Sequence, residues 1–313
     1  MNKELSLRTL GDVEQHVKAL TKNYYDDYVP VKELKFDNLS TVRIAGEKHK
    51  LRKMGQQGIA FRCGIPLSYL QKCPESVQAF NLNYWIKQEK NEELFFRFDA
   101  EDNVRTVFSP KYKKLDNIQV IRNLYSMGFD KKADARCTID DNFMSLSIFD
   151  EKSSFKINGD QMRNGYCFSN SETGLASFSL AAFLYRLVCS NGLISKKNVS
   201  LASFPHVSEK TLSKIPALLE DTSRELSKQK KSFELSTKSP VDDPQATIQS
   251  FNKQFQINAV EREAVEWALP FESGETMFNI INTYTKAAQF ESLSAAQSYK
   301  LQKTGGQILS LVN

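Results

Sequence analysis

The sequence predicts an α+β fold, in which an antiparallel body rich in β-hairpins and packed helices precedes a helical C-terminal region. Short segments of alternating apolar and polar residues recur up to about residue 204, and turn-forming residues separate them. From Val207 onward the apolar spacing becomes helical and charges become frequent. Hairpins followed by helices favour α+β over a parallel α/β sheet. The predicted domains are residues 1–207 and 208–313.

The N-terminal elements begin with a predicted helix over residues 10–20 and a tyrosine-rich loop, 24–28, that ends at Pro30. Strands are predicted around residues 32–36 and 41–44. The segment Gly55-Gln56-Gln57-Gly58 is predicted to be a loop, but no Gly-Lys-Ser/Thr follows it as in a phosphate-binding loop.

Two prolines, Pro66 and Pro74, each indicate the start of a helix, because proline fits the first helical turn. The second of these helices carries Trp85, which we expect in the core.

The clearest hairpin joins residues 94–98 to 103–108 across a polar turn. A helix is predicted over 117–127, capped by Asp116 or Asn117 and ended by Gly128. A second hairpin is predicted to join 135–139 to 144–149. The later helices are expected over residues 208–229, 244–269, 274–288 and 293–311.

Bulk composition excludes several classes of protein. The 313 residues are 41% hydrophobic and 25% charged, which is ordinary for a globular chain. No apolar run approaches the ~18 residues of a membrane span, and the first residues lack the apolar core of a signal peptide, so we expect a cytoplasmic protein. Five cysteines without C-x-x-C spacing and three scattered histidines support neither a metal site nor a cofactor.

The least ordinary stretch is residues 155–195, where two polar turns flank the apolar segment 175–188. The first turn is Asn170-Ser171-Glu172-Thr173-Gly174, and the second is Cys189-Ser190-Asn191-Gly192. The apolar segment carries one charge, Arg186. A buried arginine is rarely left unpaired, so Glu172 is its predicted partner.

This stretch resembles a family of phage- and plasmid-type proteins called domain of unknown function 932. The residues that carry the resemblance are Asn170, Glu172 and Gly174 of the first turn, Arg186 of the apolar segment, and Asn191 and Gly192 of the second turn. Three further segments fit the same family pattern, namely NLNYW at 81–85, VRTVFSPKY at 104–112 and TMFNIINTYT at 276–285. The resemblance implies a protein of a mobile element in a bacterial host cell, and it implies no established activity.

Basic residues are concentrated between residues 105 and 136, which hold eight Lys or Arg and three acids. That excess of five equals the net charge of the whole chain. A local basic excess is expected of a protein that binds a phosphate backbone, although it also occurs on an ordinary solvated face. The predicted nucleic-acid-binding residues are Arg105, Lys111, Tyr112, Lys113, Lys114 and Arg122.

Two functions therefore remain open from the sequence. The first is a non-enzymatic accessory protein that binds DNA, either single-stranded or duplex, in recombination or replication, with single strands favoured. The second is an inhibitor that binds a host defence protein as a homo-oligomer, which would need an exposed apolar stripe on residues 244–311. A weaker third hypothesis is an enzyme that acts on nucleic acid, in which Asp140, Asp141, Asp160 and Glu172 would converge on Mg²⁺.

Overall fold

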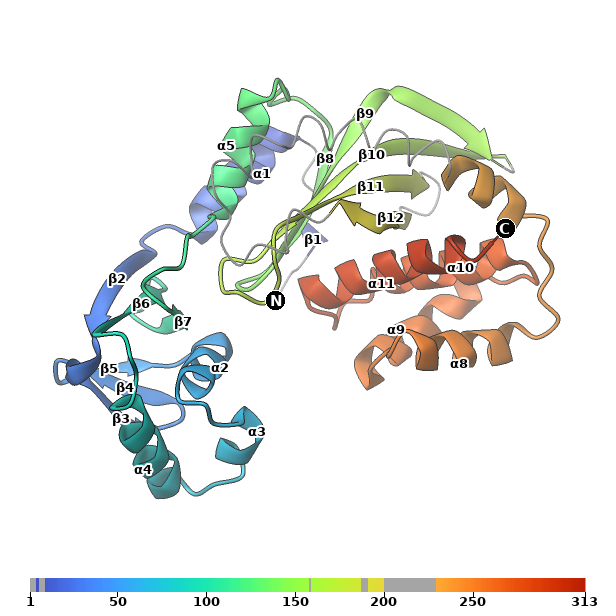
Figure 1. Ribbon diagram of the computed structural model, residues 1–313. Helices are drawn as coiled ribbons and strands as arrows, with labels where there is room; N and C mark the ends of the chain where they lie inside the picture. Colours follow the sequence, from blue (N-terminus) through green and yellow to red (C-terminus); the bar gives the residue numbers. More distant parts are fainter. Residues whose placement is uncertain (1–3, 6–8, 158, 187–190, 200–228, 313) are drawn as a thin grey trace. The chain divides into compact units, whose positions relative to one another are not determined.

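The computed structural model describes residues 4–5, 9–157, 159–186, 191–199 and 229–312, and it divides the chain into two compact units (Figure 1). The large unit contains residues 1–14, 117–171 and 176–313, and the small unit contains residues 15–116 and 172–175. The predicted α+β class is confirmed. The predicted boundary near residue 207 lies outside the described residues. The helices after it share a unit with the preceding sheet, so the division differs from the predicted one.

The large unit is built on a six-stranded antiparallel sheet with the order β1-β8-β9-β10-β11-β12. The second predicted hairpin is confirmed as β8 and β9, and Asp140 closes its turn by accepting the backbone N–H groups of Asn142 and Phe143. The strand bounds are β1 (Glu4–Leu5), β8 (Ala135–Ile139), β9 (Met144–Ile157), β10 (Asp160–Asn170), β11 (Ser179–Arg186) and β12 (Asn191–Val199).

Two layers of helices accompany this sheet (Figure 1). Helices α10 (Met277–Ala287) and α11 (Ala295–Leu309) contact β12, while α8 (Pro244–Gln254) and α9 (Ala259–Ala268) pack on α10 from the other side. The Tyr284 hydroxyl joins the helical layers by donating to the carbonyl of Ile248, 3.1 Å away. Helix α5 (Asn117–Ser126) also belongs to this unit, and α1 (Leu10–Leu20) starts in it.

The small unit combines two three-stranded antiparallel sheets with three helices. The first predicted hairpin is confirmed as β6 and β7, whose turn is held by Asp99 accepting from the backbone N–H groups of Glu101 and Asn103. The sheets are formed by β2 (Tyr25–Pro30), β6 (Glu93–Phe98) and β7 (Val104–Phe108), and by β3 (Leu34–Asn38), β4 (Thr41–Ile44) and β5 (Glu47–Lys50). The helices are α2 (Lys53–Arg62), α3 (Leu67–Leu70) and α4 (Glu75–Ile86).

Two predicted loops of the small unit are wrong. The tyrosine-rich segment is strand β2, which pairs with β6. The segment Gly55–Gly58 lies inside helix α2, where both glycines face the backbone of β7. A Cβ atom on Gly55 would lie 2.8 Å from the Val104 carbonyl oxygen, and one on Gly58 would lie 2.8 Å from that of Val107. The glycines therefore serve close helix–strand packing, and not a turn.

None of the helices in the described part of the chain is both long enough and apolar enough to cross a lipid bilayer.

Candidate nucleic-acid interface

Arg105, the first residue of the predicted patch, lies inside the small unit. It is 6% exposed, and both of its terminal nitrogens donate to the Glu172 carboxylate at 3.2 Å. Its guanidinium group also lies over the Tyr24 ring, 4.4 Å from the centroid. The prediction that Arg105 faces nucleic acid is wrong, because both faces of β7 are covered and the charge is buried with a partner.

A second buried arginine extends this cluster of charges. Arg97 donates to Asp26 at 2.8 Å, to Asp116, and to the Glu172 carbonyl oxygen at 3.1 Å. Lys114 donates to Asp26 at 2.7 Å. Burial acts to raise the pKa of Asp26, but the charges of Arg97 and Lys114 outweigh it and hold that pKa below its usual value. We call these six residues the arginine–carboxylate cluster: Asp26, Arg97, Arg105, Lys114, Asp116 and Glu172.

The arginine–carboxylate cluster has three cationic and three anionic side chains, so its charges balance. Breaking one buried pair is strongly destabilising, because it leaves an uncompensated charge inside the protein. The cluster is therefore a structural element of the small unit. It accounts for two of the six residues predicted to bind nucleic acid, Arg105 and Lys114.

Tyr112 was predicted to offer its ring to a base, and that prediction is wrong for one face of the ring. Its ring stacks on Phe108 with a centroid distance of 3.7 Å and an interplanar angle of 6°. Burial raises the pKa of its hydroxyl. Lys111 and Lys113 on either side are exposed, as predicted, and Lys114 is also exposed but pairs with Asp26. Arg122 is also exposed, but it lies on α5 in the large unit.

The first polar turn is a structural feature that two independent contacts explain. Asn170 donates to the Asn117 side-chain oxygen at 2.9 Å. Gly174 has φ +81°, and a Cβ atom there would lie 2.7 Å from the Phe108 ring, so only glycine fits without rearrangement. The turn thus carries a packing constraint in addition to the Glu172 carboxylate.

The predicted pairing of Glu172 with Arg186 is wrong. Glu172 accepts from Arg105 instead, and Arg186 donates to Asp160 at 2.7 Å and to Glu272 at 2.8 Å. Both charges find partners within their own unit, which sequence distance alone did not reveal.

The second polar turn is described only in part, since residues 187–190 lie outside the described residues. The backbone of Asn191 pairs with that of Arg186 at the start of β12. A Cβ atom on Gly192 would lie 2.6 Å from the Phe183 ring, so this glycine permits close packing within the sheet.

The acids proposed for a metal site have separate structural tasks. Asp140 accepts the N–H of Ala295 at the start of α11, 2.9 Å away, and Asp160 pairs with Arg186. In the described ranges, no group of three or more His, Cys, Asp or Glu side chains could hold a metal ion. Burial raises the pKa of the Cys63 and Cys137 thiols to about 12, which keeps them protonated and weakly reactive at neutral pH.

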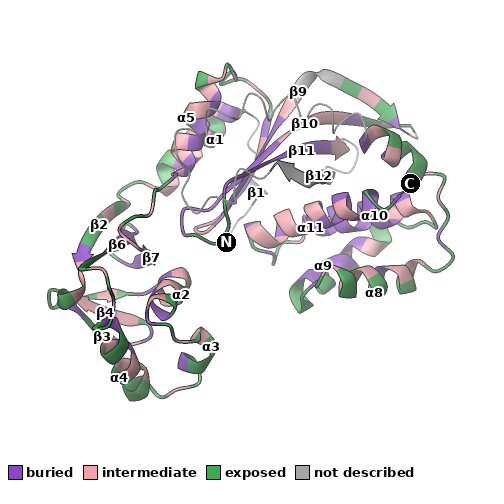
Figure 2. Ribbon diagram, viewed as in Figure 1, coloured by how far each residue is buried: buried purple, intermediate pink, exposed green. Residues whose placement is uncertain are grey.

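Exposed aromatic side chains on the small unit form the feature that sequence reasoning missed. Trp85 is 46% exposed, so its predicted place in the core is wrong. Figure 2 shows much of α4 coloured as exposed. Of the eight exposed aromatic residues in the described part of the chain, seven belong to the small unit and one, Phe271, to the large unit. The seven are Tyr25, Tyr28, Phe61, Tyr69, Phe80, Tyr84 and Trp85.

The net charge is divided as unevenly as the aromatic residues. The small unit has 18 basic and 14 acidic residues, a net charge of +4. The large unit has 24 basic and 23 acidic residues, a net charge of +1. The small unit therefore carries four-fifths of the net charge in about one-third of the residues.

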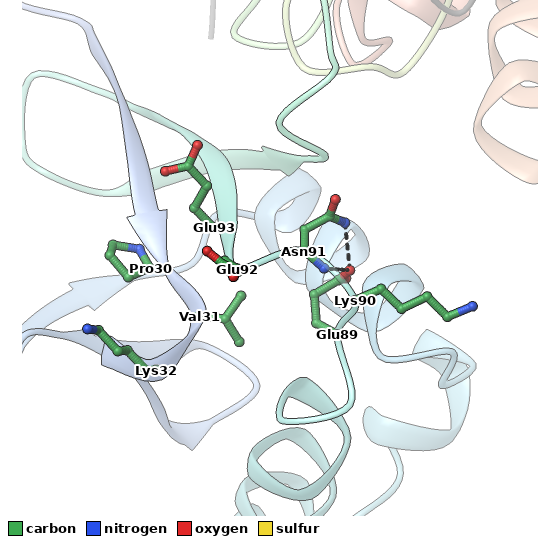
Figure 3. Close-up of a pocket in the computed structure, with 8 residues that line it drawn as sticks. All are labelled: Pro30, Val31, Lys32, Glu89, Lys90, Asn91, Glu92 and Glu93. Carbon is green, nitrogen blue, oxygen red and sulfur yellow. Dashed lines mark hydrogen bonds between the residues drawn. The ribbon is translucent and has the colours of Figure 1, made fainter.

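A pocket of about 840 Å³ opens at the junction between β2 and the segment that leads into β6 (Figure 3). Its lysines, Lys32 and Lys90, alternate with acids, and Glu89 accepts from both Arg62 and Asn91. The mixed charge of this lining selects neither an anionic nor a cationic ligand. The lining residues are Pro30, Val31, Lys32, Glu89, Lys90, Asn91, Glu92 and Glu93.

A family match agrees with the motifs of the two polar turns. The family described as "Domain of unknown function (DUF932)" matches residues 104–297, which is more than half of the chain. The chain belongs to this family. The predicted resemblance is thus confirmed, and the match begins at β7, after the exposed helix α4. No curated protein and no solved structure matches the chain.

Proposed function

We propose that this member of the DUF932 family binds single-stranded nucleic acid without catalysing a reaction, and that the small unit supplies the binding surface. One observation carries the proposal: the small unit combines a net charge of +4 with seven of the eight described exposed aromatic residues. Basic side chains attract the phosphate backbone, and aromatic rings stack on unpaired bases of any sequence.

The setting we propose is recombination or replication of a phage or plasmid in the host cytoplasm. DNA is the expected ligand, since an accessory protein of this kind meets single strands during both processes. The basic surface of the small unit is formed by residues other than the arginine–carboxylate cluster, because the charges of that cluster are neutralised internally.

The alternative proposal, an oligomeric inhibitor of a host defence protein, has less support. It requires an apolar stripe on residues 244–311. In that range, the exposed large apolar residues are Val260, Phe271 and Leu311. The other large apolar side chains of α8–α11 are buried or partly buried around Tyr284 and Ile281.

The first test measures the binding of fluorescently labelled single-stranded and duplex DNA by anisotropy at several salt concentrations. We expect tighter binding of the single strand and a linear fall of log K with log salt. Each lost phosphate contact lowers that slope by about 0.7 for a single strand, so Lys111→Gln/Lys113→Gln should reduce it by roughly 1.4.

The matched control is Lys238→Gln/Lys253→Gln, which removes the same charge from exposed positions of the large unit. We expect this control to keep the wild-type slope. Failure of the wild-type protein to bind any single strand at low salt would overturn the proposed function. Equal slopes for the two double variants would overturn the assignment of binding to the small unit.

A further inference from the structure

Helix α4 presents a second apolar face to solvent. One side of the helix is anchored in the small unit, where Leu82 and Ile86 are buried. Asn83 strengthens the anchor, since its side chain accepts the Phe36 N–H and donates to the Phe36 carbonyl, both at 2.8 Å. The opposite side carries Phe80 and Tyr84, which are 70% and 53% exposed.

The exposed rings lie at helical spacing and touch one another. Phe80 and Tyr84 are one turn apart and nearly parallel, with centroids 6.2 Å apart and planes inclined by 15°. Trp85 stands edge-on to Tyr84 at 5.2 Å. Tyr69 of α3 borders this side of α4, because its hydroxyl lies near Asn81 as well as Cys73. We call Phe80, Tyr84 and Trp85 the α4 aromatic face.

We propose that the α4 aromatic face is a base-stacking site for unpaired nucleotides, with Lys87 contacting the adjacent phosphate. The proposal rests on the function proposed above and names the residues that contact the bases. Lys87 follows Tyr84 by three residues and Phe80 by seven, so it lies on the same side of the helix.

Charge and composition together favour a nucleic-acid strand over a protein as the occupant. The exposed residues of this helix face are mainly aromatic, with Val77 as the one large aliphatic side chain. Between residues 62 and 93, the exposed lysines are Lys72, Lys87 and Lys90, and the exposed acids are Glu75, Glu92 and Glu93. The other charges of that segment, Arg62 and Glu89, pair with each other at 2.6 Å. These local charges balance, so the attraction for an anionic strand comes from the net charge of +4 of the small unit, and the flat rings suit the bases of the strand.

Tryptophan fluorescence tests the site directly. The chain has two tryptophans, and Trp267 packs against Phe271 and Phe290 in the large unit. In a Trp267→Phe variant, Trp85 is therefore the sole reporter. We expect a single-stranded thymidine oligonucleotide to quench its emission, and a blunt duplex of equal length to quench it much less.

Affinity measurements on exposed positions complete the test. Phe80→Ala/Tyr84→Ala should weaken single-strand binding by about tenfold or more, with an unchanged salt slope, because stacking does not release counterions. Phe80→Leu/Tyr84→Leu should bind as weakly as the alanine variant, since leucine keeps apolar area but has no ring. Phe271→Ala, which removes the exposed aromatic residue of the large unit, should keep wild-type affinity.

The outcomes separate this inference from the proposed function. Normal single-strand affinity in the alanine variant, with unquenched Trp85, overturns the stacking site and leaves the proposed function standing. Recovery of affinity by the leucine variant also overturns it, because generic apolar contact would then suffice. A dimer in light scattering that the alanine variant abolishes makes a second copy the occupant and overturns it too. Failure of the wild-type protein to bind any single strand overturns both.

Discussion

The two units stabilise their structures by different means. The large unit joins its helices to a sheet through an apolar core around Ile281 and Tyr284. The small unit buries Arg97, Arg105 and Glu172 of the arginine–carboxylate cluster and packs α2 on β7 through two glycines. The small unit also leaves most of the exposed aromatic side chains in solvent. Aromatic rings that stay in solvent do not stabilise the folded unit, and such exposed rings are typical of a surface that contacts another molecule.

Helix ends show the same contrast. Helices α8, α9 and α11 of the large unit are capped by the side chains of Asp243, Asn258 and Ser294. Helices α2, α3 and α4 of the small unit have no side-chain cap, and two of them begin after proline. Helix α10 of the large unit also lacks a side-chain cap, so the contrast holds for α8, α9 and α11, whose first turns rely on local hydrogen bonds.

Of the substitutions that test this difference between the units, removal of the Glu172 carboxylate should destabilise the small unit most. Glu172→Ala leaves Arg105 buried without its carboxylate, which costs about 3–5 kcal/mol of unfolding free energy. Hydrogen exchange followed by mass spectrometry should show lost protection in β6 and β7 while α10 and α11 remain protected. The control Arg105→Met/Glu172→Leu removes both charges and should destabilise less. Equal loss of protection in both units would show that they unfold together.

A smaller effect is expected from the close approach of α2 to β7. Gly58→Ala would ordinarily favour a helix by about 1 kcal/mol, but its Cβ atom would lie 2.8 Å from the Val107 carbonyl oxygen. We expect the clash to prevail and lower the unfolding free energy of the small unit by about 1–3 kcal/mol, measured by the same hydrogen exchange. Gln57→Ala, at the exposed neighbouring position, should change it by less than about 0.5 kcal/mol. A more stable Gly58→Ala protein would contradict the packing role of this glycine.

Acid should loosen the small unit before the large one. Burial acts to raise the pKa of Asp26, Glu89 and Asp99, yet their hydrogen-bonding and cationic neighbours prevail and lower all three below their ordinary values of 3.8, 4.5 and 3.8. A carboxyl whose folded pKa is lowered adds stability above its unfolded pKa and loses it as pH falls toward the folded value. A carboxyl pKa that is lower by one unit in the folded protein than in the unfolded chain contributes about 1.4 kcal/mol of stability at neutral pH.

The measurement is hydrogen exchange at matched intrinsic rates between pH 6 and pH 2.5. Amides of β2 and β6 should lose protection as the pH falls below about 4.5, at a higher pH than those of α10 and α11. The Asp26→Asn variant should show a smaller difference between the two ends of this range, because one linked carboxyl is gone. Loss of amide protection at the same pH in both units would contradict the prediction that the small unit is the more acid-sensitive one.

The sequence predicts those elements that depend on local patterns. The predicted helix over residues 10–20 and the predicted strand over residues 41–44 have the same bounds in the structure, because apolar spacing and nearby turn residues specify them. The hairpin of β6 and β7 follows from its polar turn, where the Asp99 side chain accepts backbone N–H groups two and four residues later. The α+β class was predictable for the same reason.

The candidate site was mostly unpredictable, because its determinants are distant in the sequence. Glu172, the partner of Arg105, lies 67 residues further along the chain, and no local sequence pattern predicts that they pair. The Gly55–Gly58 segment resembles a loop until β7 is placed against it. In α4, buried Leu82 and exposed Tyr84 are both apolar, so the sequence shows one hydrophobic helix where the structure has two distinct faces.

The smallest expected effect concerns the capped helices of the large unit. Ser294 accepts the Gln297 N–H, and the Gln297 side chain accepts the Ser294 N–H in return. Ser294→Ala should lower the stability of α11 by about 1 kcal/mol, detected as faster exchange of its first-turn amides, while α2 and α4 stay unchanged. Ser294→Asp preserves an acceptor at this position and should restore wild-type exchange. An unchanged exchange rate in the alanine variant would mean that packing, and not capping, stabilises the start of α11. The first turn of α11 would then be stabilised in the same way as the uncapped helices of the small unit.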